Sequence, residues 1–296
     1  MKEKFKKESL VINLSVLLST IFLISEIIMA ICTNSRAILI DCISGGADLF
    51  LIVVISFLLP LIYRPVSEKT PYGYSQIESI FIILKGFAVV IISMFLIKDS
   101  IEILLSGGTE LDYSSIAIFE LILGIFCVIS YVVLKKMSKG VKTPVVKSDL
   151  IVWKIDMIYS FGMFLSFAIQ IFLVNTRFSV ISPYVDSALA IIISLFMLPE
   201  PFKMIIKSFK NIILFAPEKE TIEEIKEIVG KEIKMYPYEP TFYDVVKTGR
   251  KIWIEVYIKS ENNMLNLVEL KKAKKQVEKH LKQEFDEIYV ELTPEL

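Results

Sequence analysis

The chain has 296 residues, of which 54% are hydrophobic, and its mean hydropathy of +0.60 is well above that of an ordinary soluble protein. Its 33 Lys and Arg balance its 33 Asp and Glu, and the lack of a basic cluster that could follow phosphates argues against nucleic acid as a partner. Segment 217–296 alone contains 14 of these basic and 17 of these acidic residues. This asymmetry predicts a lipid-embedded part followed by a water-exposed part.

Six apolar segments are long enough to cross a bilayer, because a helix needs about 20 residues to span a hydrocarbon core of about 30 Å. In chain order they are 10–32, 37–62, 77–98, 114–135, 148–174 and 182–203. The first segment follows four lysines, but it is too long for a signal peptide and ends without a small-residue cleavage site. We therefore expect it to be retained as the first of six transmembrane helices.

The basic residues between these segments predict the orientation, since Lys and Arg accumulate in cytoplasmic loops. Fourteen lie on the side of the N-terminus and three on the other side. The first group is Lys2, Lys4, Lys6, Lys7, Arg64, Lys69, Lys135, Lys136, Lys139, Lys142, Lys147, Lys203, Lys207 and Lys210, and the second is Arg36, Lys98 and Arg177. We expect a multi-pass protein of the cell membrane with both termini in the cytoplasm.

From residue 217 the pattern changes to that of a small soluble α+β domain. Its expected elements are an amphipathic helix at 218–234, strands at 240–248 and 251–259, a Lys-rich helix at 264–284 and a strand at 287–292. Their order is αββαβ. The expected domains are a cytosolic N-terminal tail at 1–9, a six-helix transmembrane domain at 10–210 and a cytosolic domain at 211–296.

Two of the predicted spans carry matching acidic stripes. The second has Asp41, Ser44 and Asp48, and the fifth has Asp149, Val152 and Asp156, at the same spacing on one helix face. Each ionisable group in lipid costs roughly 2.5 to 3.5 kcal/mol, so each needs a partner or a function. Two facing stripes predict one oxygen-lined site at mid-membrane. Asp41 and Asp149 lie near span ends, where solvation or capping of backbone groups is an alternative.

Five further segments carry recognisable patterns. They are 35–48 (SRAILIDCISGGAD), 71–79 (PYGYSQIES), 148–156, 182–186 and 215–218. Together they resemble the signature motifs of the cation diffusion facilitators, a family of proton-coupled exporters of divalent metals. The resemblance spans the whole chain and implies a homodimer in which the αββαβ segment is a ferredoxin-like cytosolic domain.

The resemblance also implies a transport site with two ligands from the second span and two from the fifth. At the matching positions this chain has Ser44 and Asp48, and Val152 and Asp156. Zinc-transporting members usually have His or Asp at the first position of each pair. The departure to Ser and Val makes zinc selectivity doubtful, because zinc favours nitrogen and sulfur ligands.

An all-oxygen site is the alternative to a zinc site, since the single histidine, His280, lies in the cytosolic helix. Its ligands would be Asp48, Asp156 and Ser44, with Asp41 or Asp149 as a further donor. Such a site suits a harder ion such as Mn²⁺, Fe²⁺ or Mg²⁺. The expected ligands are thus a transported divalent cation and protons, with no prosthetic group.

Four other positions can be compared with the family pattern. Two of them depart from it, and two match it at places that are not expected to bind metal. Gln76 and Leu214 replace a Lys and an Asp that can form a charge lock near the dimer contact, so we expect an apolar or hydrogen-bonded substitute. Glu78 and Asp186 match family positions and are expected to be structural partners. Metal-driven tightening of the cytosolic dimer is also doubtful, because the family's His-rich cytosolic sites have no counterpart here.

Lys154 lies roughly 200° around the helix from Asp156, so we expect its side chain to point away from the site. It would snorkel or pair with an acidic residue such as Glu26. The alternative is a fixed internal cation that replaces the charge of a metal, which would argue against transport.

The sequence is therefore consistent with two functions. The first is export of a divalent cation in exchange for protons, and the second is a non-transporting subunit, scaffold or sensor with a degenerate metal site. The chain is not expected to be an enzyme, since it has no pairing of nucleophile and base, no phosphate loop and no HExxH motif.

Overall fold

The computed structural model describes residues 2–33, 36–107, 113–141, 143–174, 176–177, 179–260, 264–285 and 287–295. Parts of the sequence-based predictions fall on residues outside these ranges. They are the first residue of the N-terminal tail, Ser35 of the second-span motif, Lys142 of the loop before the fifth span, residues 34, 108–112, 175 and 178 of the predicted transmembrane domain, and residues 261–263, 286 and 296 of the predicted cytosolic domain.

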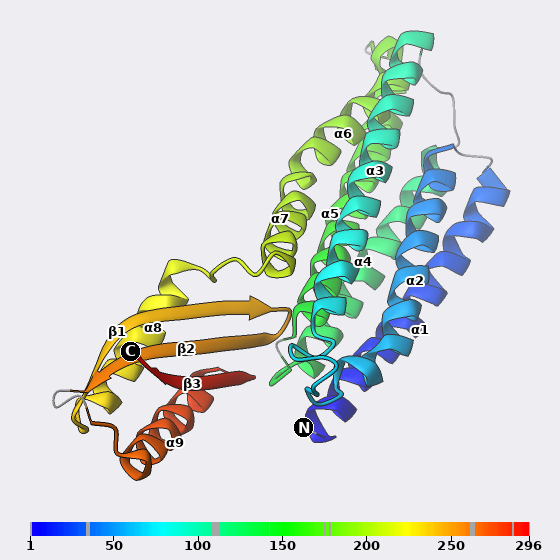
Figure 1. Cartoon of the computed structure of the whole chain (residues 1–296). Coiled ribbons are helices and arrows are strands. Elements are labelled where there is room, and N and C mark those ends of the chain that lie inside the picture. The colour runs from blue at the N-terminus through cyan, green and yellow to red at the C-terminus, as the bar shows by residue number, and fades with distance from the viewer. Residues whose placement is uncertain are drawn as a thin grey trace. The chain divides into compact units, whose positions relative to one another are not determined.

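The first two thirds of the chain form long helices (Figure 1). They are α1 (Lys2–Thr33), α2 (Arg36–Ile62), α3 (Gln76–Ser106), α4 (Tyr113–Met137), α5 (Pro144–Val174), the short 3-10 helix η1 (Ser179–Ile181), α6 (Ser182–Met197) and α7 (Pro199–Ile212). Within the described residues, six stretches are long and apolar enough to cross a membrane, with Ser179–Ile212 counted as one. The prediction of a six-span membrane protein is confirmed. Residues 2–9, expected as a tail, continue helix α1.

The surfaces of these helices are apolar, and many of their buried positions are polar. Phe57 and Phe172 are among the most exposed large side chains, whereas Ser15, Glu26 and Ser166 are buried. This is the distribution expected in lipid, where apolar side chains gain nothing by being buried and polar side chains must find partners inside the bundle.

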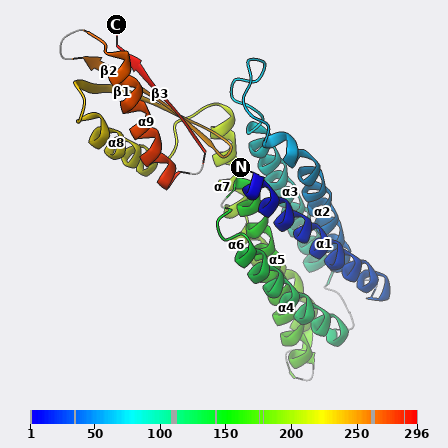
Figure 2. The ribbon, with the colours of Figure 1, turned by 90° about the horizontal axis from the view of Figure 1, so that it is seen from below.

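Close approaches between neighbouring helices are made at glycines. Helix α4 packs along α5, α5 along α6, and α1 along α2 (Figures 1 and 2). Gly162 of α5 faces Ile193 of α6 so closely that a Cβ atom would lie 2.1 Å from the Ile193 Cδ1 atom. Gly86 of α3 faces Ile205 of α7 in the same way, at 2.7 Å from its Cγ1 atom. Packing of this kind holds helices together in lipid, because small residues let backbones approach.

The C-terminal part has the αββαβ order expected from the sequence. Its elements are α8 (Lys219–Ile233), β1 (Tyr238–Thr248), β2 (Lys251–Ser260), α9 (Leu267–Glu284) and β3 (Ile288–Pro294). The described strands form one sheet in the order β1-β2-β3, with β1 antiparallel and β3 parallel to β2. Alternate residues of β2 are buried in a core shared with α8 and α9. Asn266 caps α9 by accepting hydrogen bonds from the Val268 and Glu269 amides.

The chain divides into two compact units: Met1–Tyr63 with Phe81–Ile206, and Arg64–Ile80 with Lys207–Leu296. The second unit therefore contains the loop between α2 and α3 as well as the αββαβ domain. Glu78, in the first turn of α3, accepts a hydrogen bond of 2.9 Å from Arg250 Nε and also pairs with its guanidinium Nη2. The Ser75 and Thr248 hydroxyls are 3.2 Å apart. Glu78 is thus a structural partner of the β1–β2 turn.

Candidate functional site

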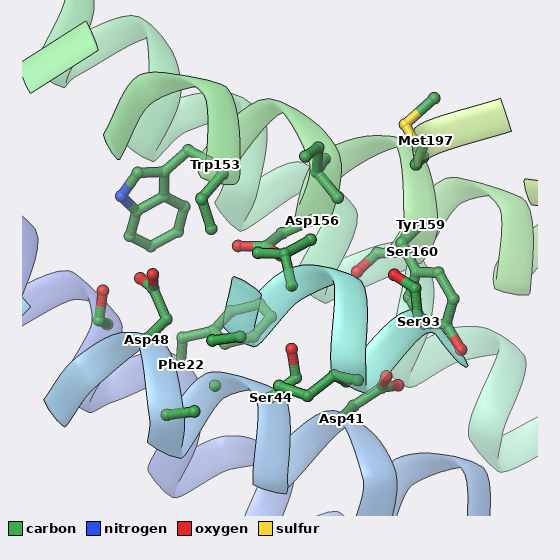
Figure 3. A pocket seen from close by; sticks show the side chains of 18 of the residues that line it. Phe22, Asp41, Ser44, Asp48, Ser93, Trp153, Asp156, Tyr159, Ser160 and Met197 are labelled. Atoms are coloured by element: carbon green, nitrogen blue, oxygen red, sulfur yellow. The ribbon is translucent and has the colours of Figure 1, made fainter. Parts of the chain in front are cut away.

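A pocket of about 100 Å³ lies among the transmembrane helices (Figure 3). Helices α1 to α6 all contribute side chains to its wall. Its charged lining residues are Glu26, Asp41, Asp48, Lys85, Glu120 and Asp156. The pocket therefore holds six ionisable groups among apolar spans, where each such group needs compensation.

The two acidic stripes predicted from the sequence do meet. Asp41, Ser44 and Asp48 of α2 line the pocket together with Asp156 of α5. Figure 3 shows Ser44, Asp48 and Asp156 directed into the same space from facing helices. Asp149 does not line the pocket, but it is linked to it through Lys85. That these residues hold a metal stays a prediction.

Lys85 of α3 is the residue that sequence reasoning missed. It is completely buried, and its ammonium nitrogen lies 2.8 Å from Asp48 Oδ1 and 2.9 Å from Asp149 Oδ1. Asp149 also accepts a hydrogen bond of 2.6 Å from the Ser15 hydroxyl, which in turn accepts one from Trp153 Nε1. This network connects α1, α2, α3 and α5. A solvated or backbone-capping role for Asp149 is excluded, because its carboxylate is buried and ion-paired.

The internal cation that the sequence analysis considered is therefore present, but it is Lys85 and not Lys154. Lys154 is exposed, as expected from its direction on α5, whereas Glu26 is buried. The signal for Lys85 was available: a single lysine within the apolar run of the third span costs enough in lipid to require a partner. Its position in the sequence does not show which aspartates its ammonium group contacts.

Glu26 of α1 and Glu120 of α4 are further carboxylates of the pocket. Their exposed fractions are 3% and 2%. Both lie in the interior of apolar spans. The free-energy cost of placing an ionisable group in lipid therefore identifies them, like Lys85, as residues that need a partner. The Glu26 Oε2 atom lies against Gly45 of α2, where a Cβ atom would be only 2.9 Å away. Five carboxylates thus line the pocket, and of these Asp48 is ion-paired with Lys85. The other four are Glu26, Asp41, Glu120 and Asp156.

The donors of the pocket suit a hard cation better than zinc. They are carboxylates and the hydroxyls of Ser44, Tyr159 and Ser160, with the thioether of Met197 at the edge, while His280 lies in α9. In the described part of the chain, no three Asp, Glu, His or Cys side chains already stand where they would hold a metal together. Direct coordination would therefore need side-chain movement, beginning with release of Asp48 from Lys85.

Comparison with known proteins gives one result for the transmembrane part. The family model of the cation efflux transmembrane domain matches residues 12–213, which is more than half of the chain. No curated protein matches the chain. The matched residues include every residue that lines the pocket. The chain therefore belongs to the cation efflux family, the cation diffusion facilitators that its motifs resemble, and its six-span part is the transmembrane domain of a metal cation transporter.

Proposed function

We propose that the protein exports a divalent cation from the cytoplasm in exchange for protons. It would act as a homodimer in the cell membrane, with both termini in the cytoplasm. The observation that carries the proposal is the meeting of Asp48 and Ser44 of α2 with Asp156 of α5 in one buried pocket. These are the positions at which the family pattern implies ligands.

The donor chemistry supports a hard ion as cargo. Carboxylate and hydroxyl oxygens, with water, are the ligands that Mn²⁺, Fe²⁺ and Mg²⁺ accept in proteins. A pocket of about 100 Å³ has room for several water molecules, since one water needs roughly 10 to 15 Å³. The cation can therefore keep part of its hydration shell, as Mg²⁺ does in most protein sites.

Proton exchange is supported by the electrostatics of a buried carboxylate cluster. Low dielectric and neighbouring negative charges favour the protonated form of a carboxyl group. A cation that enters from the cytoplasm displaces these protons, because only the deprotonated form is a good ligand. Rearrangement of the helices then opens the loaded pocket outward, where protons replace the cation.

The function is tested by flux into liposomes that contain the purified protein and a pH-sensitive dye. We expect Mn²⁺ gradients to drive proton movement, with a smaller response to Zn²⁺. Asp156→Asn and Asp48→Asn should abolish the flux, because each removes a proposed ligand charge. Lys154→Gln is the matched control on the surface of α5 and should leave the flux unchanged. Full activity of both Asn variants would refute the proposed site.

The pairing of Lys85 with Asp48 and Asp149 favours a second candidate, a non-transporting member of the family. In that case the ammonium permanently takes the place of a cargo ion. The same liposomes separate the two functions. Folded wild-type protein that moves none of Mn²⁺, Fe²⁺, Mg²⁺ and Zn²⁺ would favour the scaffold or sensor role.

A further inference from the structure

Some of the carboxylates in and beside the pocket are paired with Lys85, and others line the pocket without being part of that ion pair. Lys85 neutralises Asp48 and Asp149. Glu26 of α1, Asp41 of α2 and Glu120 of α4 also line the pocket. When these carboxyl groups are ionised they repel one another, and either protons or a cation held in the pocket relieves that repulsion.

Glu26 provides the most direct evidence that these carboxylates bind a ligand. Its side chain is buried, and its Oε2 atom accepts no hydrogen bond from the residues that the structure describes. A buried carboxylate oxygen without a partner is costly, and native proteins satisfy nearly all such groups with water, ions or protein donors. The oxygen belongs to a residue that lines the pocket, so a group inside the pocket can satisfy it.

The helix opposite Glu26 is shaped to admit its carboxylate. Gly45 of α2 leaves the space in which Oε2 lies, because a Cβ atom on Gly45 would approach this oxygen to 2.9 Å. The next residue, Gly46, has no atom within 4 Å of the corresponding position. Gly45 stands next to Ser44, so the Glu26 carboxylate is held on the pocket side of α2.

We infer that Glu26, Asp41 and Glu120 form a second site for a partly hydrated, hard divalent cation, separate from the lysine-bound pair Asp48 and Asp149. Tyr159 and Ser160 of α5 add hydroxyl oxygens to the same wall. Water molecules bridge the cation to the carboxylates, which fits side chains that do not stand at direct coordinating positions. The inference rests on the proposed function, since it gives the same cargo a second binding site in the pocket.

The test is equilibrium binding of Mn²⁺ to the purified full-length chain in detergent, followed by the electron paramagnetic resonance signal of free Mn²⁺. Glu26→Gln and Glu120→Gln keep the size of each side chain and remove its charge. We expect each to weaken Mn²⁺ binding by at least about tenfold, because affinity for hard cations follows the charge of the ligand set.

Gly45→Ala should weaken binding in the same direction without changing any charge, because the new methyl group displaces the Glu26 carboxylate. Gly46→Ala is its matched control, since it adds the same methyl group to the same helix in open space, and it should bind Mn²⁺ as the wild type does. Thermal unfolding and size-exclusion profiles of each variant establish that it is folded.

The outcomes separate this inference from the proposed function. Mn²⁺ binding that depends on Glu26 and Gly45, in a protein without flux, would support the site and remove the transport proposal. Flux and Mn²⁺ affinity that are unchanged in Glu26→Gln, Glu120→Gln and Gly45→Ala would overturn the site and leave transport standing. Variants that alter only the pH dependence of flux, with wild-type Mn²⁺ affinity, would also overturn it, since the carboxylates would then bind protons alone. Wild-type protein that binds no Mn²⁺ would overturn both.

Discussion

Lys85 is expected to contribute strongly to the stability of the membrane helices. It is fully buried and lies between two carboxylates that come from different helices, α2 and α5. Removing one partner of a buried ion pair typically costs about 3 to 5 kcal/mol, because it leaves an uncompensated charge. Removing the Lys85 ammonium would leave two uncompensated carboxylates, those of Asp48 and Asp149.

Lys85→Met is therefore expected to lower the midpoint of thermal unfolding in detergent markedly. The double variant Lys85→Met with Asp149→Asn should recover part of the loss, since one of the two stranded charges is gone. Lys98→Met is the control on the same helix: its ion pair with Glu102 is mostly exposed, and exposed pairs contribute only about 0 to 1 kcal/mol. Equal midpoints for Lys85→Met and the wild type would show that the buried pair carries no stability.

At the scale of elements, the β1–β2 turn is fitted to the loop between α2 and α3 within the second compact unit. Gly249 of the turn has φ +56°, a left-handed conformation that favours glycine. A Cβ atom on Gly249 would lie 2.2 Å from the carbonyl oxygen of Ser75. Because that neighbour is backbone, it cannot move aside without shifting the start of α3.

Gly249→Ala is expected to loosen this contact. The left-handed conformation alone costs about 1 to 3 kcal/mol for a residue with a side chain, and the clash adds to it. Hydrogen exchange measured by mass spectrometry should become faster in 64–80 and in the turn. Gly230→Ala in α8 is the control, because its Cβ atom would meet open space and alanine favours a helix by up to about 1 kcal/mol. Unchanged exchange in Gly249→Ala would mean that the turn does not hold the loop.

At the scale of the whole molecule, the uneven distribution of loop charge predicts the sidedness of the chain. Fourteen basic residues on one side against three on the other correspond to a cytoplasmic N-terminus and C-terminus. The loop that contains Glu68 should then face the cytoplasm, and the segment around Arg177, between α5 and η1, should face outward.

Sided labelling with a membrane-impermeant maleimide tests this orientation. The native cysteines Cys32, Cys42 and Cys127 are free thiols and would first be replaced by alanine. A cysteine at position 177 should react in intact cells, and one at position 68 only after the membrane is opened. The reverse pattern would invert the proposed direction of transport.

The sequence was sufficient for features that depend on local pattern. Apolar length predicted the six spans, and the pattern of the C-terminal segment predicted the αββαβ order of its helices and strands. Spacing on α2 and α5 predicted that Asp48 and Asp156 would share a site. The break between α6 and α7 was not predicted within the segment 182–203, although Pro199 begins the new helix, as proline often does.

The charge balance of the pocket could not be predicted in the same way. It depends on which faces of α1, α3 and α4 turn toward α2 and α5, and periodicity on one helix does not give its rotation against another. Lys85, Glu26 and Glu120 were each visible as costly residues in lipid, but their partners became evident only from the packing.

The attachment of the Lys85 ammonium to the chain has a practical consequence. A metal ion that balanced Asp48 and Asp149 could be stripped by a chelator, and the bundle would then be left with unpaired charges. The Lys85 ammonium is covalently part of the chain, so neither a chelator nor dialysis removes it. Preparations kept in EDTA should thus retain the packing of α2, α3 and α5, so that cargo can be added afterwards to a protein that is intact from the outset.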